Sequence, residues 1–252
     1  MASEVGLIIP VYNGEPFLEQ ALQSVFAQTR RPGKIILVDD GSTDGTAGIA
    51  RSHPEVTYFH QPNRGLSSAW NLGIRSAAGD FIAFLDADDL WATDMLERHC
   101  ALLEQNPEVQ VAVGLVQPFR MKPAGAENPE MVTIGAPARL FNLGSALFRK
   151  GVFDRIGLMD EDFSMAADWD WFLRAREEGV PMLTRPETAL FYRRHGANIT
   201  NWKKQLDHEL LILFKKTLER RRRHGMAGEL PRLSDFLAEV RRNAAMSHDT
   251  SE

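Results

Sequence analysis

The sequence predicts an α/β protein with a doubly wound, mostly parallel sheet and a C-terminal helical extension. Segments with a strand pattern alternate with segments of helical spacing over about the first hundred residues, which is typical of parallel strands joined by crossover helices. The chain has 252 residues, enough for one large domain of this kind. Several expected strands end in acidic residues, and open α/β sheets bind ligands at the carboxyl ends of their strands.

In the first half of the chain, short apolar runs predict strands, and apolar residues three or four apart predict helices. The expected strands are residues 5–9, 34–38, 56–59, 81–85 and 109–116. The expected helices are 16–28, 43–52, 66–77 and 90–105, with Gly79 and Asn106-Pro107 as stop signals. Trp70 falls on the apolar side of its helix and Cys100 lies inside another, so we expect both side chains in the core.

The second half is less regular. Residues 118–137 are rich in Pro, Gly, Ala and Glu without periodicity, which predicts a long loop. A strand is expected at 145–148, helices at 150–156 and 168–178, and strands near Met182 and Ala189. Two further helices are expected at 205–224 and 233–245. The apolar stripe of the first could pack on its own domain, on a second subunit or on lipid, so the oligomeric state stays open.

Composition excludes several classes of protein. Hydrophobic residues make up 44% and charged residues 25%, as in ordinary globular proteins. A net charge of −5 gives no case for nucleic-acid binding, and a single cysteine excludes an internal disulfide and a multi-cysteine zinc site. No signal-like or membrane-spanning apolar run is present. We expect a cytoplasmic protein, and the basic end of helix 205–224 leaves peripheral contact with the inner face of a membrane open.

Three carboxylates follow the apolar strand at 81–85, in the segment Asp86-Ala87-Asp88-Asp89. If the backbone stays extended, Asp86 and Asp88 project to the same side, where a hard divalent cation with phosphate ligands could bridge them. The structural alternative is that Asp88 or Asp89 caps the helix that follows.

A second acidic segment, Asp39-Asp40-Gly41-Ser42-Thr43-Asp44, closes the strand at 34–38. Two adjacent acids there could accept hydrogen bonds from a base or a ribose. Asp, Gly and Ser also favour turns and helix caps, so the alternative is a plain strand-to-helix turn. Because both acidic segments end strands of the same sheet, we expect them at one edge.

Four segments occur in a recognisable order: 8–14 (Ile-Ile-Pro-Val-Tyr-Asn-Gly), 38–44, 63–74 and 85–89. In them the chain resembles family 2 glycosyltransferases of the GT-A fold, and the resemblance extends over roughly residues 5–200. It implies a nucleoside-diphosphate sugar donor, with UDP as the default, and Mg²⁺ or Mn²⁺ as cofactor. The donor-binding residues that it implies are Pro10, Tyr12, Asn13, Asp39, Asp40, Arg64, Asp86 and Ala87, with Asp88 as a metal ligand. Trp70 stands where the family has arginine.

The resemblance continues more loosely in the second half. Asp168 matches the family's general base, although the preceding family glutamate is Ala167 here. The alternative is that Asp168 caps a helix, and we expect Asp170 to pair with Arg174 four residues later. Residues 192–200 resemble a Tyr-Arg-x-His-x-x-Asn-x-Ser/Thr segment of bacterial members.

In that segment, the resemblance implies that His195 reaches the metal or the diphosphate, and Arg193 and Arg194 could offset phosphate charge. The alternative is a surface loop in which His195 only bonds backbone.

The resemblance therefore implies an inverting, metal-dependent glycosyltransferase that uses a carbohydrate or lipid-linked acceptor in cell-surface glycan synthesis. It divides the chain into a catalytic domain at 1–200, with a donor half at 1–117 and an acceptor half at 138–200, and a helical extension at 201–252. Two rival hypotheses are a nucleotidyltransferase and a non-catalytic sugar-nucleotide-binding scaffold, the second kept open by Trp70 and Ala167.

Overall fold

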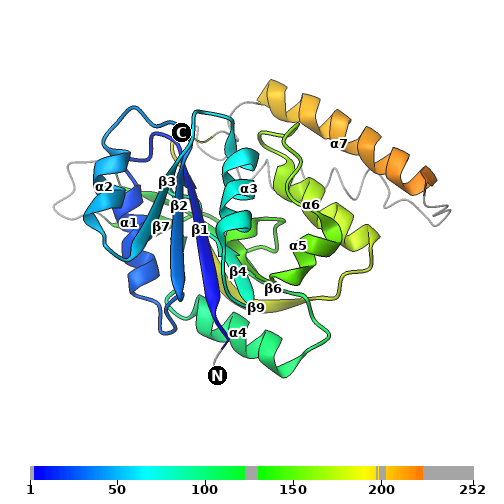
Figure 1. Cartoon of the computed structure of the whole chain (residues 1–252), viewed down its shortest axis with the longest axis horizontal. Helices are drawn as coiled ribbons and strands as arrows, with labels where there is room; N and C mark the ends of the chain where they lie inside the picture. Colours follow the sequence, from blue (N-terminus) through cyan, green and yellow to red (C-terminus); the bar gives the residue numbers. More distant parts are fainter. Residues whose placement is uncertain (1–2, 123–129, 197, 199–202, 224–252) are drawn as a thin grey trace.

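The computed structural model describes residues 3–122, 130–196, 198 and 203–223. These residues form one nine-stranded sheet in the order β3-β2-β1-β4-β8-β6-β9-β5, with β7 paired to β6 (Figure 1). The strands are β1 (Val5–Val11), β2 (Lys34–Asp39), β3 (Val56–His60), β4 (Phe81–Phe84), β5 (Leu90–Trp91), β6 (Val111–Met121), β7 (Met131–Thr133), β8 (Ala146–Arg149) and β9 (Met182–Arg193). The helices are α1 (Leu18–Phe26), α2 (Thr46–Ser52), α3 (Leu66–Ser76), α4 (Met95–Gln105), α5 (Gly151–Ile156), α6 (Ala167–Glu177) and α7 (Lys203–Arg223), with a 3₁₀ turn at Leu143–Ser145.

Most strands of the sheet run in one direction. β1 is parallel to β2 and β4, and β2 is parallel to β3. β8 is antiparallel to both β4 and β6, so β6 runs with β4, and β9 is parallel to β6. The carboxyl ends of β1, β2, β3, β4, β6 and β9 therefore lie at the same edge, which confirms the predicted mostly parallel sheet.

Helices cover both faces of the sheet. Adjacent strand residues point to opposite sides, and because both are apolar here, each face must be buried under helices. Leu7 and Ile9 of β1 pack in the core that includes α1 and α4, whereas Ile8 packs in the core that includes α3, α5 and α6. The three-layer arrangement is visible in Figure 1. The doubly wound prediction is confirmed, and Trp70 and Cys100 are buried as expected, at 5% and 0% exposure.

The close contact between α3 and β1 depends on Gly73. A Cβ atom at this position would lie 2.3 Å from Cγ2 of Ile8. We expect Gly73→Ala to lower the free energy of unfolding by about 1–3 kcal/mol, because overpacking outweighs the gain in helix propensity. Gly48→Ala in α2 is the matched control, since a Cβ there meets nothing within 4 Å. Urea unfolding of both variants tests this; equal stability would contradict it.

α7 lies along α6 and packs on the protein's own core (Figure 1). Leu213 is fully buried in the same core as Trp171, and Leu206 is 9% exposed. Leu211 faces outward at 70% exposure. Of the three possible partners of the apolar stripe, the structure therefore identifies the chain's own domain as the one on which the stripe packs. His224 and the expected helix 233–245 lie outside the described residues, and the domain boundary at 200 stays a prediction.

The predicted helix 90–105 begins later than expected. Leu90 and Trp91 form β5, which pairs with Phe191 and Leu190 of β9, and α4 starts at Met95. The Trp91 indole also donates a hydrogen bond of 2.8 Å to the carbonyl of Gly144. Pairing with a strand a hundred residues away decides the conformation here, and the local helical spacing does not reveal it.

The predicted loop 118–137 is also partly wrong. β6 continues to Met121, and β7 at Met131–Thr133 pairs with it in antiparallel fashion; residues 123–129 lie outside the described part. The two strands expected near Met182 and Ala189 are one strand, β9. Register shifts interrupt its pairing with β6, and these irregularities break the periodicity that a single strand would show.

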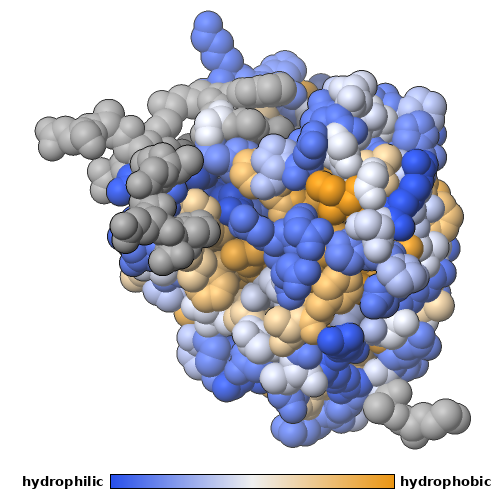
Figure 2. All heavy atoms as spheres, turned by 90° about the vertical axis from the view of Figure 1, so that its left-hand side faces the viewer, coloured by the Kyte–Doolittle hydropathy of each residue, from blue (hydrophilic) through white to orange (hydrophobic). Residues whose placement is uncertain are grey.

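The surface of the described residues exposes few large apolar side chains, namely Tyr12, Met131, Leu183 and Leu211. Figure 2 views the side that carries α1 and α2, where hydrophilic side chains surround separate apolar patches. Within the described ranges, none of the helices has the length and apolar character that crossing a bilayer requires.

Candidate active site

The acidic segment after β4 lies in a turn at the carboxyl edge of the sheet. The Leu85 amide still donates to the carbonyl of Ile8, at 3.0 Å, and the Asp89 amide then donates to the carbonyl of Asp86, at 3.0 Å. The backbone is therefore not extended over 86–89. The expectation that strand alternation aligns Asp86 with Asp88 is wrong, and the turn brings the carboxylates together instead.

Asp89 is a structural member of this cluster. Its side chain is 1% exposed, and Oδ1 accepts a hydrogen bond of 2.8 Å from the amide of Arg193. Asp89 thus joins the turn after β4 to the end of β9. The alternative that Asp88 or Asp89 caps the next helix is wrong, because α4 begins only at Met95.

Arg193 lies beside the cluster inside the protein, and its charge offsets only part of the repulsion that acts on Asp89. Its Nε donates to the carbonyl of Asp88, at 2.6 Å, and Nη2 donates to Oε1 of Gln20, at 2.8 Å. The guanidinium lies over the rings of Phe17 and Phe119, at 5.3 and 4.9 Å. With 3% exposure, Arg193 is held inside the fold, which corrects the suggestion that it offsets phosphate charge.

The structure brings Asp88 and His195 together, as the resemblance implied. Nε2 of His195 lies 2.9 Å from Oδ2 of Asp88. The imidazole stacks on Phe17, with ring centroids 4.4 Å apart. Asn198 accepts the His195 amide at 2.6 Å through Oδ1 and donates to the carbonyl of Arg193 at 3.0 Å. His195 is thus oriented toward the acidic cluster, unlike a histidine that only bonds backbone.

The acidic cluster is strained electrostatically. Burial, and then repulsion from Asp88, raises the pKa of Asp86. Burial, Asp88 and Asp86 raise the pKa of Asp89 well above its ordinary value. Asp86 keeps some exposure at the surface. The surrounding protein therefore removes much of the water around its carboxylate but leaves it accessible from solvent. A cation at this edge would relieve the repulsion.

The acidic and imidazole side chains at this edge suit a metal ion that is also coordinated by phosphates of a substrate. Among the described residues, no three His, Cys, Asp or Glu side chains converge into a ready-made metal site. Asp88, with 30% side-chain exposure, and His195, with 17%, offer one carboxylate oxygen and one imidazole nitrogen. Mg²⁺ is commonly bound by one or two carboxylates together with substrate phosphates, so these residues suit a metal–diphosphate complex.

The loops after β1 and β2 are joined next to this cluster. Asn13 has the left-handed φ of 51°, which asparagine tolerates better than most residues. Its amide donates to Oγ of Ser42 and its Oδ1 accepts the amide of Thr43, both at 2.9 Å. The neighbouring Tyr12 is 54% exposed. A Cβ at Gly14 would lie 3.5 Å from the Cβ of Ala87, so these loops adjoin the acidic turn.

Asp39 and Asp40 are buried, at 1% and 4% exposure. Asp39 accepts the Ser42 amide at 2.7 Å and the Tyr58 hydroxyl at 2.6 Å. Burial favours a higher pKa for Asp39, but these hydrogen bonds outweigh it and lower the pKa. The Asp40 carboxylate holds the loop before α3. Both carboxylates thus have a structural role in holding these loops, and their binding of a sugar donor stays a prediction.

Asp40 Oδ1 accepts the amide of Arg64 and Oδ2 accepts that of Gly65, both at 2.8 Å. The Arg64 side chain is 64% exposed, and its guanidinium lies 3.5 Å from Oε2 of Glu161. Arg64 therefore faces the segment that leads to α6. Pro10 lies buried within β1, in register with Val38 of β2.

Asp168 is the second residue of α6 and lies near enough to Asp86 to feel its charge. The position before the helix is Ala166 and has no side-chain capping bond, so the capping alternative for Asp168 is wrong. Its Oδ1 accepts the amide of Trp169 at 2.8 Å. Burial, and then the charge of Asp86, raises the pKa of Asp168 well above its ordinary value, although the side chain keeps some exposure.

Asp170 pairs with Arg174 as predicted, with 2.7 Å between Oδ2 and Nε. The structure adds residues that sequence reasoning did not place at the site. Asn198 had a signal in its spacing from His195. Phe17 under the imidazole had none, because the contact joins residues far apart in the chain.

Comparison with known proteins agrees with this arrangement. The family described as Glycosyl transferase family 2 matches residues 7–167. The uncharacterized glycosyltransferase EpsJ of Bacillus subtilis is 31% identical over 245 residues, which cover 89% of this chain and 71% of EpsJ. The uncharacterized glycosyltransferase RT0329 of Rickettsia typhi is 34% identical over 211 residues, which cover 78% of this chain and 66% of RT0329. The matches thus span about two thirds of these relatives.

Two solved structures share the fold. The mannosyltransferase PcManGT from Pyrobaculum calidifontis, in complex with GDP-Man and Mn²⁺, has a TM-score of 0.70 and 22% identity over 99% of this chain and 71% of its own. TarS from S. aureus, in complex with UDP-GlcNAc, has a TM-score of 0.64 and 19% identity over 77% of this chain and 60% of its own. At these identities the likeness shows the fold, which is GT-A.

Proposed function

Because this chain belongs to glycosyl transferase family 2, we propose that it transfers a sugar, with inversion, from a nucleoside-diphosphate sugar to an acceptor hydroxyl. One observation carries the proposal. Asp168 lies at the same edge as the acidic turn after β4, close enough for the charge of Asp86 to raise its pKa. A base beside a candidate diphosphate site is what a single displacement requires.

The donor would lie across the carboxyl ends of β1, β2 and β4. We propose that the nucleotide lies toward the exposed Tyr12 and the loops that Asn13 and Asp40 organise, and that the diphosphate lies toward Asp86 and Asp88. UDP is the first candidate nucleotide. The structures of TarS with UDP-GlcNAc and of PcManGT with GDP-Man support a donor of this class.

Asp88 and His195 would hold Mg²⁺ or Mn²⁺. When bound, the metal would neutralise charge on the departing nucleoside diphosphate. Phe17 and Asn198 orient the His195 side chain and backbone, and Arg193 holds the backbone of Asp88. These contacts keep the metal-binding atoms in place before the donor arrives.

Asp168 would act as the base. In the proposed step, the acceptor oxygen bonds to the anomeric carbon as the bond from that carbon to the diphosphate oxygen breaks on the opposite face. The hydroxyl proton moves to the Asp168 carboxylate. A carboxylate with a raised pKa accepts a proton more readily, and the opposite-face attack inverts the configuration.

We propose a carbohydrate or lipid-linked acceptor of cell-surface glycan synthesis. The exposed end of α7 carries Lys215, with 78% side-chain exposure, and the exposed Arg222 and Arg223. Such a basic end would favour peripheral contact with an anionic membrane where a lipid-linked acceptor resides.

Asp88→Ala is expected to abolish metal-dependent donor binding. We expect one of UDP-N-acetylglucosamine, GDP-mannose and dTDP-glucose to raise the melting temperature of the wild-type protein in the presence of Mn²⁺ and not in EDTA. The rise should vanish in Asp88→Ala and persist in Asp207→Ala, an exposed acid of α7. A full, Mn²⁺-dependent rise in Asp88→Ala would remove Asp88 from the metal site.

Product analysis separates the rival functions. Release of nucleoside diphosphate, with a product whose anomeric configuration by NMR is opposite to that of the donor, supports the proposal. Conversion of a nucleoside triphosphate and a sugar phosphate to pyrophosphate would indicate a nucleotidyltransferase. Metal-dependent donor binding without turnover across acceptors would indicate a scaffold.

A further inference from the structure

We propose that Glu209 of α7 is a positioning residue for Asp168. Its carboxylate holds the backbone of residues 164–166, which leads directly into α6, and so determines where the Asp168 side chain lies. The inference rests on the proposed role of Asp168 as the base. It makes α7 a functional part of the transferase.

Glu209 binds this segment with both carboxylate oxygens. Oε1 accepts hydrogen bonds from the Ser164 hydroxyl, at 2.7 Å, and from the Ser164 amide, at 3.3 Å. Oε2 accepts the amides of Met165, at 2.8 Å, and Ala166, at 3.0 Å. With 4% exposure, Glu209 makes these bonds out of reach of competing water.

The cap position before α6 has no side chain that could hold the start of the helix. The first amides of a helix lack intrahelical acceptors, and a Ser, Thr, Asp or Asn at the cap position commonly supplies one. Here that position is Ala166, without a capping side chain. Glu209, 43 residues away, accepts the amide of Ala166 itself, whereas Oδ1 of Asp168 accepts the Trp169 amide within the first turn. The negative charge of Glu209 suits the positive end of the helix.

The same segment is held from the opposite side by α3. The Ser67 hydroxyl donates to the carbonyl of Phe163, at 2.6 Å. The Asn71 side chain accepts the Met159 amide, at 2.9 Å, and donates to its carbonyl, at 3.0 Å. Residues 159–166 are thus clamped between α3, which follows the donor-side loop, and α7. Asp168 lies two residues beyond the clamp.

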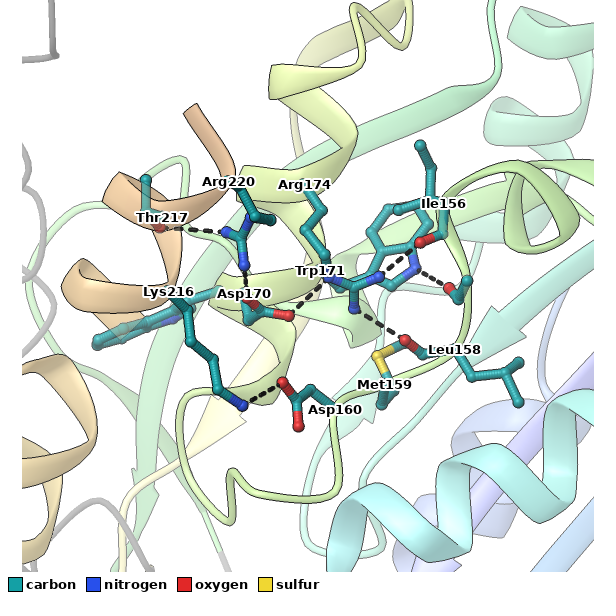
Figure 3. A network of polar contacts seen from close by, with 12 residues as sticks. Ile156, Leu158, Met159, Asp160, Asp170, Trp171, Arg174, Lys216, Thr217 and Arg220 are labelled. Atoms are coloured by element: carbon teal, nitrogen blue, oxygen red, sulfur yellow. Dashed lines mark hydrogen bonds and ion pairs between the residues drawn. The ribbon is translucent and has the colours of Figure 1, made fainter. Parts of the chain in front are cut away.

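Further along α7, two cations reach the same region, as Figure 3 shows. Nζ of Lys216 lies 2.6 Å from Oδ2 of Asp160, and Nη1 of Arg220 lies 2.9 Å from Oδ1 of Asp170. α7 therefore contacts the chain on both sides of Asp168. Glu209 is distinguished among these residues because it binds the backbone immediately before α6.

Glu209→Gln tests the inference with little change in shape. The amide group can turn an acceptor toward only one side, so either the Ser164 donors or the Met165 and Ala166 amides would face an NH₂ group. Glu219→Gln is the matched control, because Glu219 lies on the same helix with 49% side-chain exposure and a distant partner, Lys215, at 4.0 Å.

Two measurements are made on the full chain. Hydrogen exchange is followed in peptides that contain residues 164–168, without ligand. Hydrolysis of the nucleoside-diphosphate sugar that gave the Mn²⁺-dependent thermal shift is then measured, with water as acceptor. We expect faster exchange in that peptide and a fall in kcat of at least about tenfold, since small misplacements of a catalytic group cost this much. KM for the donor should stay unchanged. A general loosening of the protein would change KM as well.

The outcomes separate this inference from the proposed function. If Asp168→Asn is inactive and Glu209→Gln keeps wild-type kcat, or if exchange at 164–168 matches that of Glu219→Gln, the positioning role is wrong and the base assignment stands. If Asp168→Asn hydrolyses donor at the wild-type rate, the base assignment is wrong and the positioning role falls with it.

Discussion

Asp168→Asn is expected to lower turnover by about 10²–10⁴-fold, the contribution of a general base, and to leave donor affinity unchanged. Asparagine keeps the shape of the side chain and can still accept the 2.8 Å hydrogen bond from the Trp169 amide, but it cannot take the acceptor proton. Wild-type turnover should rise with pH through the raised pKa of Asp168. Steady-state kinetics with Mn²⁺ over a range of pH test both expectations.

The same substitution is expected to stabilise the protein at neutral pH. Burial, and then Asp86, raises the pKa of Asp168 in the folded state. The folded protein therefore holds this proton over a pH window in which the unfolded chain has lost it. Wild-type stability falls as the pH rises from about 4, the ordinary aspartate pKa, to the folded-state pKa. The variant lacks this loss, so its advantage in melting temperature should grow over that window and then level off.

Asp207→Asn is the matched control, an exposed acid that changes to the same amide. It should alter neither turnover nor the pH dependence of the melting temperature. An Asp168→Asn protein with wild-type turnover, or with a lower melting temperature than wild type above neutral pH, would contradict the description of Asp168 as a desolvated base.

Asp170→Ala is expected to reduce the free energy of unfolding by about 3–5 kcal/mol, the cost of breaking a buried ion pair from one side. Asp170 is 0% exposed and binds Arg174 at 2.7 Å and Arg220 at 2.9 Å (Figure 3). Arg174 also donates to the carbonyls of Ile156 and Leu158, at 2.7 and 2.8 Å. Without Asp170, two guanidiniums would lose their shared carboxylate between α6 and α7.

Urea unfolding followed by circular dichroism measures this loss. Glu219→Ala is the matched control, because it breaks an exposed pair four residues apart, with Lys215 at 4.0 Å. Exposed pairs of this kind contribute about 0–1 kcal/mol. A loss in Asp170→Ala no larger than that of the control would show that the network around Arg174 and Arg220 does not depend on the carboxylate.

Asp168 and Asp170 illustrate what a pattern of residues can and cannot distinguish. Both are acids in the first turn of α6, and the spacing to Arg174 identified only the structural one. Asp168 differs because none of the described residues forms an ion pair with it and because it lies near Asp86. That nearness depends on how β4 and α6 meet in space, and no local spacing reports it.

The sequence by itself determined the layers of the fold and the order of its first strands and helices. Apolar periodicity and stop residues are local properties, so they identified β1 to β4 and α1 to α3, and with them the edge where Asp39, Asp40, Asp86 and Asp88 lie. Family 2 membership also followed from local motifs, because those segments keep their order along the chain.

Only the tertiary structure decided which residues act together. β5 exists because Leu90 and Trp91 pair with β9, Asp89 faces Arg193 instead of a helix start, and Glu209 holds the residue before α6 from 43 residues away. Each of these contacts joins segments that are remote in sequence. Burial and hydrogen bonding across such distances depend on the packed fold, and for that reason the sequence could name the acids of the site but not the partners that hold them.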